Sequence, residues 1–249
     1  MPELTLLGVR VDAFDRDTLE EAILADAAKK ECRIYEYINV HALNLACDDP
    51  RFRDALNSAT VTYCDGEGVR VGARVLGRRL PPRTVLTYWI WDLCRRFQEE
   101  GRSVYFLGGH DEVVRKAVDL LRQRFPALKI AGWHHGYFAK PGEESRRIVD
   151  DINRAGPDVL FVGFGMPVQE FWIAEHRTRL SVGVILPAGS MIDYIAGTRT
   201  PAPAWMAGHG LEWLYRLCRE PGRLWRRYLL GNPLFLLRVI AQRIRSGTI

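Results

Sequence analysis

A chain of 249 residues with 47% hydrophobic residues can hold one large α/β domain, or a domain with a helical extension, and this composition excludes wholesale disorder. The net charge of +5 is unevenly spread. Residues 205–249 hold 8 arginines, no lysine and 2 glutamates, a difference of +6 that leaves −1 for the preceding residues. A basic segment on a nearly neutral body predicts that this segment meets an anionic partner.

The cysteines and the apolar runs exclude other classes of protein. Five scattered cysteines without a Cys-x-x-Cys pair favour buried thiols in a reducing compartment over a disulfide scaffold or a zinc ribbon. The N-terminus carries acids where a signal peptide needs a basic region, so we expect no export. The longest apolar run, residues 228–241, is interrupted by Gly231, Asn232, Pro233 and Arg238. It predicts contact with a membrane surface and no membrane-spanning helix.

Short runs rich in β-branched and aromatic residues alternate with helical patterns along the chain. We expect one or two strands at residues 4–14, and single strands at residues 33–39, 60–66, 103–109, 129–133, 158–165 and 182–189. We expect helices at residues 15–30, 40–57, 68–76, 87–100, 111–124, 143–154 and 168–179. This alternation predicts an α/β fold with a Rossmann-like, doubly wound and mostly parallel sheet.

The Pro-rich residues 198–205 are the expected domain boundary, because the composition changes after them. We therefore divide the chain into an α/β catalytic domain, residues 1–200, and a C-terminal helical appendage, residues 201–249, that is rich in basic and aromatic residues. The sheet and its helices are expected to be complete by about Ile195.

Four predicted strands end on distinctive residues. Ligands of open α/β sheets bind beyond the carboxyl ends of the strands, so these residues predict a single site. They are Asn39, Asp65, Gly108, Gly109, Gly163 and Gly165, with Gln169 and Glu170 in the first turn of the following helix. Asp65 is a short carboxylate between a strand and a glycine, a placement that suits a general base. The alternative is an Asp-Gly turn that stabilises only itself.

The glycine turns allow two interpretations. They would let backbone N–H groups approach a phosphate at a helix N-terminus, or they would serve close packing of strand against helix. Neither turn has the third glycine of the dinucleotide fingerprint, which disfavours a nucleotide-dependent oxidoreductase. Gln169 and Glu170 face the same rim, or they only begin a helix with a favourable acid.

No set of residues has the spacing of a metal site. His134-His135 lies in a predicted loop, and Asp15-Arg16-Asp17 opens a helix and is interpreted as its cap. If a nucleotide diphosphate leaves without a metal, arginine must offset its charge. Arg216, Arg223 and Arg226 are seven and three residues apart, so a helix would place them near one face, although Pro221 bends it.

Several motifs extend almost from end to end of the chain. They are Asn39 after a strand, CDGEGV, YFLGG, FP-x-LKIAGW-x-x-GYF, VGFGMPVQEFW, AGSMIDYIAG and EWLYRLCREPGRLWRRY. With them the chain resembles the WecG/TagA/CpsF glycosyltransferases, bacterial enzymes that make lipid-linked precursors of surface polysaccharide. The resemblance implies an inverting, metal-independent transfer of a hexose or N-acetylhexosamine-type sugar. The donor would be a UDP-sugar and the acceptor an undecaprenyl-diphosphate-linked saccharide.

The resemblance also implies roles for individual residues. Its catalytic residues fall on Asp65, Asn39, Arg216, Arg223 and Arg226. Substrate-binding residues are expected at Tyr37, Gly108, Gly109, Gly163, Gly165, Gln169, Glu170 and Asp193. Departures from the family pattern occur at Tyr37, Leu86, Tyr88 and Pro201, where the family has Thr, Gly, Asp and Arg. Because Tyr37 and Tyr88 lie near the expected sugar pocket, these departures predict a shifted sugar specificity.

The expected partners follow from the same resemblance and from the basic tail. They are a UDP-sugar, a polyprenyl-diphosphate-linked acceptor and an anionic membrane surface, with a homo-oligomer possible and with no cofactor and no nucleic acid. The expected location is the cytoplasmic face of the cell membrane, in peripheral association. Two alternatives stay open: a non-enzymatic nucleotide- or membrane-binding α/β module, and a nucleotide-dependent oxidoreductase.

Overall fold

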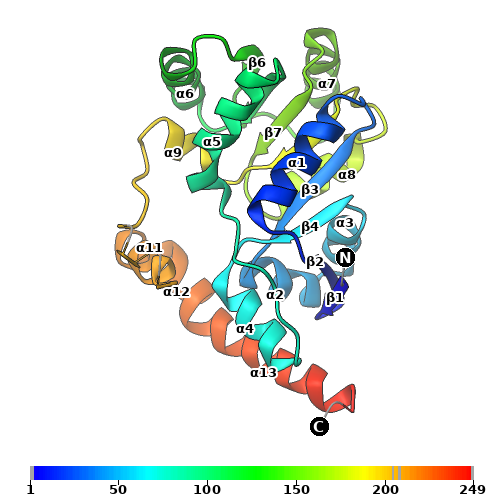
Figure 1. Cartoon of the computed structure of the whole chain (residues 1–249), viewed down its shortest axis with the longest axis vertical. Coiled ribbons are helices and arrows are strands. Elements are labelled where there is room, and N and C mark those ends of the chain that lie inside the picture. Colours follow the sequence, from blue (N-terminus) through cyan, green and yellow to red (C-terminus); the bar gives the residue numbers. More distant parts are fainter. Residues whose placement is uncertain (1–2, 204, 207–208, 248–249) are drawn as a thin grey trace.

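A six-stranded sheet forms the centre of the molecule in the computed structural model, which describes residues 3–203, 205–206 and 209–247. Its strand order is β4-β3-β8-β7-β5-β6, and every neighbouring pair is parallel (Figure 1). The strands are β3 (Arg33–Ile38), β4 (Val61–Cys64), β5 (Ser103–Gly108), β6 (Lys129–His134), β7 (Val159–Gly163) and β8 (Val184–Pro187). A wholly parallel sheet of this kind confirms the predicted α/β class.

Helices cover both faces of the sheet, as in a doubly wound fold. One face packs against α1 (Arg16–Ala27), α5 (Leu86–Glu99), α6 (Asp111–Arg124) and α9 (Met191–Ile195). The other face packs against α2 (Val40–Asp48), α3 (Pro50–Asn57), α4 (Glu67–Val75), α7 (Glu143–Ala155) and α8 (Val168–His176). Side chains alternate between the faces, so Phe106 stacks on Phe161 toward α5 while Leu107 and Val162 point toward α7.

The N-terminal run forms the two strands expected there, and one expected helix takes a different form. The N-terminal β-rich run forms an antiparallel hairpin, β1 (Glu3–Leu6) and β2 (Val9–Asp12), that pairs outside the main sheet. The single helix expected at residues 40–57 is wrong, because α2 ends at Asp48 and α3 begins at Pro50. Proline disfavours helical geometry at the residue before it, and Asp49 accordingly has φ −127° and ψ 107°.

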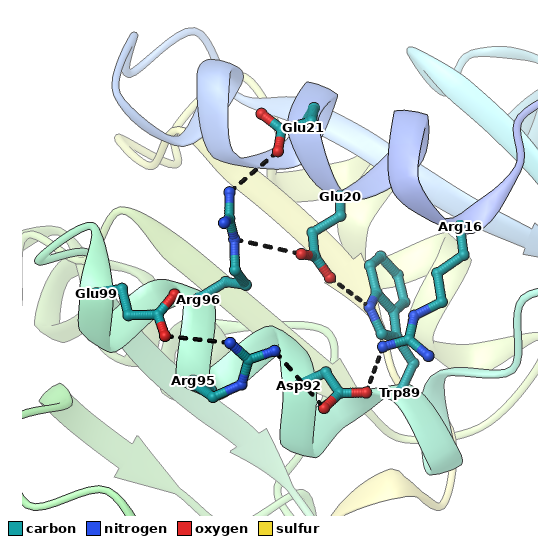
Figure 2. Close-up of polar contacts among 8 residues, drawn as sticks. All are labelled: Arg16, Glu20, Glu21, Trp89, Asp92, Arg95, Arg96 and Glu99. Carbon is teal, nitrogen blue, oxygen red and sulfur yellow. Dashed lines mark hydrogen bonds and ion pairs between the residues drawn. The ribbon is translucent and has the colours of Figure 1, made fainter.

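Polar side chains connect α1 to α5 at their solvent-facing edges (Figure 2). Arg96 pairs with Glu20 at 3.3 Å and with Glu21 at 3.0 Å, and the Trp89 indole donates to Glu20 at 2.7 Å. These residues of α1 and α5 therefore hold the two helices together.

Asp15 caps α1 by accepting from the Thr18 N–H at 2.9 Å, which confirms its interpretation as a cap.

The C-terminal segment is a chain of short helices that ends in a long one. Its elements are α11 (Glu212–Arg219), α12 (Pro221–Trp225), the π-helix η1 (Arg226–Leu230) and α13 (Gly231–Arg245). In Figure 1 α13 runs alongside α4 and α2, and it places Phe235 and Val239 in the same core cluster as Leu6 and Ala73. The sheet and the helices that cover it end at Ile195, as expected, and α13 adds two further side chains to the core. The boundary near residue 200 stays a prediction.

Candidate active site

A cleft of about 940 Å³ opens at the carboxyl ends of the six parallel strands. Each strand, or the loop after it, contributes to the wall, through Tyr37, Asn39, Asp65, Gly109, Gly136, Gly163, Gly165 and Gly189. Segments of the C-terminal tail close the other side, with Glu212, Arg216, Arg223 and Arg227. The fold thus brings the expected strand-end residues and the basic tail to one place.

Asp65 and Asn39 lie side by side because β3 and β4 are neighbouring parallel strands. The Asp65 N–H continues the ladder by donating to the Ile38 carbonyl at 2.9 Å. Asn39 caps α2, since its Oδ1 accepts from the Ala42 N–H at 3.1 Å. That bond directs the amide Nδ2 toward Asp65 Oδ2, at 3.4 Å. The Asp65 carboxylate is therefore held against the cleft by the residue that begins the adjacent helix.

The surroundings of Asp65 raise its pKa to about 6. Burial is the main cause, because it disfavours the charged carboxylate. The Asn39 amide opposes this rise, the Glu212 charge adds to it, and the guanidinium of Arg216 counteracts it. A carboxyl group with this pKa is mostly ionised at pH 7 and can still accept a proton readily, which suits a general base.

The tail arginines do not lie on one helical face, because Pro221 starts a new helix. Arg216 of α11 and Arg223 of α12 both line the cleft. Arg226 does not: it is exposed and its guanidinium carbon lies 5.2 Å from the centroid of the Trp225 ring. Its neighbour Arg227 lines the cleft in its place.

The sequence carried a signal for Arg227. Leu224 and Tyr228 are buried, so they mark the inner face of the helical segment formed by α12 and η1. Arg227 is three residues after Leu224 and shares that face, whereas Arg226 is two residues after it and points away.

Gln169 lies behind the wall of the cleft and is completely buried. Its Oε1 accepts from the N–H groups of Gly165 at 3.0 Å and Gly189 at 3.1 Å. Its Nε2 donates to Glu170 Oε1 at 2.8 Å and to the Tyr37 hydroxyl at 3.2 Å. All its donors and acceptors are thus used within the protein, and the side chain braces two turns that do line the cleft.

The two expected glycine turns play different parts. Gly108 does not line the cleft, and a Cβ there would lie 2.5 Å from the Gly163 carbonyl oxygen, so close strand packing requires glycine at this position. Gly165 lines the cleft with φ +83°, a conformation that favours glycine. Its N–H is bonded to Gln169. Asp193, in α9, also lines the cleft.

One family model covers nearly the whole chain. The family model described as "Glycosyl transferase WecG/TagA/CpsF family" matches residues 4–248, which include the strands, the cleft and the tail. The chain belongs to the WecG/TagA/CpsF family of glycosyl transferases.

Three relatives share the name N-acetylglucosaminyldiphosphoundecaprenol N-acetyl-beta-D-mannosaminyltransferase. The protein of Bacillus spizizenii is 30% identical over 202 residues, which cover 81% of this chain and 76% of the relative. That of Bacillus subtilis is 29% identical over 211 residues, covering 85% and 80%. That of Staphylococcus aureus is 30% identical over 202 residues, covering 81% and 77%.

Two further groups of this transferase line the cleft and were not expected as site residues. His110 and Tyr137 stack with their ring centroids 3.9 Å apart, and Tyr137 is 65% exposed at the cleft. Lys140 lies over the rings of Phe138 and Phe164, 3.8 and 4.2 Å from their centroids, and burial lowers its pKa. The sequence signal for Tyr137 is its place in the GYF block, which follows a strand and belongs to the family motifs.

His41 is the third unexpected group. It follows Asn39 in the first turn of α2 and lines the cleft. Burial and the nearby charge of Arg227 lower its pKa to about 4, so the imidazole is neutral at pH 7 and can donate one hydrogen bond.

The sequence predicts neither a metal site nor a membrane-spanning helix. Among residues 3–203, 205–206 and 209–247, no three His, Cys, Asp or Glu side chains are grouped as a metal site would need. His134 and His135 do not line the cleft. In the same part of the chain, no helix combines the length and apolarity that crossing a membrane requires. Metal independence stays a prediction.

Glu170 and Glu36 are two acids buried beneath the cleft. Glu170 Oε2 is buried and has no hydrogen-bond partner among the described residues. Burial raises the pKa of Glu170 to about 7, and burial together with the Glu170 charge raises the pKa of Glu36 well above its ordinary value. At Glu170 the folded state therefore binds more protons than the unfolded chain between about pH 4.5 and pH 7.

This excess of protons predicts the effect of Glu170→Gln on stability. The Glu170 contribution to wild-type stability should fall as the pH rises through that window. The neutral amide should remove this contribution while keeping the acceptor for Gln169. We expect the variant to gain on the order of 1–3 kcal/mol relative to wild type between pH 5 and pH 8. Urea unfolding at several pH values measures this gain. A difference that does not change with pH would contradict an ionisable role for Glu170.

Proposed function

We propose that this transferase moves an N-acetylhexosamine-type sugar from a UDP-sugar to an undecaprenyl-diphosphate-linked saccharide, with inversion and without a metal. The observation that carries the proposal is Asp65, a carboxylate of raised pKa that lies between the strand-end cleft and the tail arginines. The names of the relatives support an N-acetylmannosaminyl donor group and an N-acetylglucosaminyl-diphosphoundecaprenol acceptor. The product would serve surface polysaccharide, whether capsule, exopolysaccharide or teichoic acid.

The proposed reaction is a single displacement at the anomeric carbon. Asp65 accepts the proton of the acceptor hydroxyl, and that oxygen attacks the anomeric carbon from the face opposite UDP. The bond from the anomeric carbon to the phosphate oxygen breaks, and UDP leaves with the bonding electrons. Inversion follows from one attack on the opposite face.

Tail arginines would offset the charge that develops on UDP. Arg216 supports this role, because its Nε is buried and has no hydrogen-bond partner among the described residues. A phosphate oxygen would satisfy that donor. Arg223 and Arg227 add positive charge to the same wall of the cleft.

Aromatic groups at the cleft suit the uridine and the sugars. The exposed ring of Tyr137, already stacked on His110, offers a surface for the uracil base. Tyr37 and Tyr88 line the cleft where the family usually has the smaller Thr and Asp. Their bulk and hydroxyl groups would change the shape of the sugar pocket, which supports a specificity that differs from that of the named relatives.

The tail also supports peripheral contact with a membrane. Exposed leucine and isoleucine side chains lie along η1 and α13, at Leu229, Leu230, Leu234, Leu236, Leu237, Ile240 and Ile244. Arginines 219, 226, 243 and 245 are exposed on the same tail. Apolar side chains beside arginines are typical of segments that rest on anionic lipid headgroups, as at the cytoplasmic face of a membrane.

The decisive experiment is a transfer assay with a panel of UDP-hexoses and UDP-N-acetylhexosamines and N-acetylglucosaminyl-diphosphate lipid as the acceptor. We expect one UDP-N-acetylhexosamine to give a disaccharide product with inverted anomeric configuration, at the same rate in EDTA as in magnesium. Transfer only from a UDP-hexose would correct the donor class. Loss of activity in EDTA with rescue by a divalent metal would overturn the role given to the arginines. Absence of transfer from any donor, with UDP still bound, would favour the binding module.

A further inference from the structure

A second groove of about 350 Å³ opens from the active-site cleft between α2, α4 and the tail. Six residues line both hollows, and they mark the junction: Asn39, His41, Asp65, Glu212, Arg216 and Arg227. The carboxylate proposed as the base therefore lies where the two spaces meet, with two guanidinium groups, the Glu212 carboxylate and a neutral imidazole around it.

Away from the junction the groove is largely apolar. Its walls come from α2, α4, α11, η1 and α13, with the side chains of Val40, Val71, Trp213, Tyr228, Phe235 and Leu236. Three polar residues also line it: Glu67, Arg83 and Asn232. Val71 and Leu236 are more than a third exposed, so this lining faces open space instead of being packed in the core. The exposed leucines of η1 and α13 continue from Leu236 along the same tail.

The groove is thus charged at one end and apolar at the other. An occupant must match both ends, with an anionic group at Arg216 and Arg227 and a hydrocarbon chain beyond it. A UDP-sugar lacks a hydrocarbon chain, and a free lipid headgroup has no reason to reach Asp65. A diphosphate that joins a sugar to an apolar chain has both parts in the required order.

We propose that this groove binds the first isoprenoid units of the polyprenyl-diphosphate acceptor. The diphosphate then lies at the groove side of the junction. Arg216 and Arg227 line both hollows, so they can face this diphosphate as well as the UDP phosphates in the cleft. The acceptor sugar reaches Asp65, and the rest of the chain leaves along the exposed leucines of the tail. The proposal rests on the proposed function, and it assigns a subsite that recognises the lipid itself, separately from the membrane in which the lipid is embedded.

The test compares two water-soluble acceptors with the same N-acetylglucosaminyl-diphosphate group, one carrying farnesyl and the other methyl, without detergent or vesicles. Wild type should have a KM at least 10-fold lower for the farnesyl acceptor. Val71→Trp fills the groove from an exposed position on α4 and should abolish this preference. The methyl acceptor's kcat/KM and the Kd for UDP should stay unchanged. The matched control is Leu237→Trp, an apolar exchange at a 65% exposed position outside the groove, which should keep the preference.

Several outcomes would overturn the groove assignment. One is that wild type has the same KM for the farnesyl and methyl acceptors. Another is that Val71→Trp lowers kcat/KM equally for both acceptors. A third is that Val71→Trp binds UDP more weakly, which would assign the groove to the donor. Titration calorimetry with farnesyl diphosphate separates this proposal from the proposed function. If neither acceptor is used but farnesyl diphosphate binds wild type at least 10-fold more tightly than Val71→Trp, the groove stands and the reaction falls. If both proteins bind it equally, the groove falls.

Discussion

Asp65→Asn is expected to lower turnover by about 10²–10⁴ and to leave UDP affinity nearly unchanged, because a general base contributes this much and does not hold the donor. The amide keeps the size of the carboxylate and can still meet the Asn39 amide, whose Nδ2 lies 3.4 Å from Asp65 Oδ2. The measurements are kcat at saturating acceptor and calorimetric titration with UDP. Near wild-type turnover would reduce Asp65 to a turn residue.

The pH dependence of kcat/KM tests the role of Asp65 as a general base independently. Because Asp65 has a pKa of about 6 and acts when ionised, kcat/KM should fall about tenfold per pH unit below pH 6. The Asn39 amide lowers that pKa, so Asn39→Ala should move the acidic limb to higher pH. The same change removes the cap of α2 and should cost about 1 kcal/mol of stability, which would not by itself move the limb.

Arg227→Ala is expected to lower kcat about 10²-fold, whereas Arg226→Ala should change it by less than about twofold. The two variants remove the same guanidinium from adjacent positions of one helical segment. Arg227 lines the cleft and lies close enough to Arg216 and Asp65 for their charges to affect its pKa, while Arg226 is exposed beside Trp225. Of these two arginines, only Arg227 can therefore act on the negative charge that develops on the departing UDP.

Two controls separate catalysis from folding in this pair. Arg227 lies over the Tyr228 ring at 5.6 Å, so thermal unfolding of both variants must show that η1 is still formed. Arg227→Lys should recover part of kcat, since it keeps the charge and loses the bidentate fork. Equal losses in the two alanine variants would mean that the tail acts through its overall charge. A large loss in Arg226→Ala alone would restore the assignment made from the family pattern.

Much of the fold follows from local patterns. β-branched strands alternating with amphipathic helices predict the parallel sheet, because both signals depend on side-chain periodicity alone. The break between α2 and α3 is local as well, because Pro50 disfavours a helical conformation at Asp49. The antiparallel hairpin β1–β2 could not be excluded from the main sheet, because strand pairing depends on distant residues.

Local sequence patterns are enough to predict the edge of the sheet at which the candidate site lies. Asn39, Asp65 and Gly165 follow different strands, and parallel strands of one sheet must bring their carboxyl ends to the same edge. Whether a residue at this edge lines the cleft or is buried behind its wall depends on tertiary packing. Gln169 follows the same strand as Gly165 but is turned inward by four hydrogen bonds to distant turns and to its neighbours. Likewise, the packing of Leu224, Tyr228 and Phe235 against the body sets the rotation of the tail, which turns Arg227 toward Asp65, leaves Arg226 in solvent and opens the groove beside Val71. The spacing of Leu224, Arg227 and Tyr228 indicates which of these residues share a face. Where that face meets the rest of the molecule depends on contacts between residues far apart in the chain.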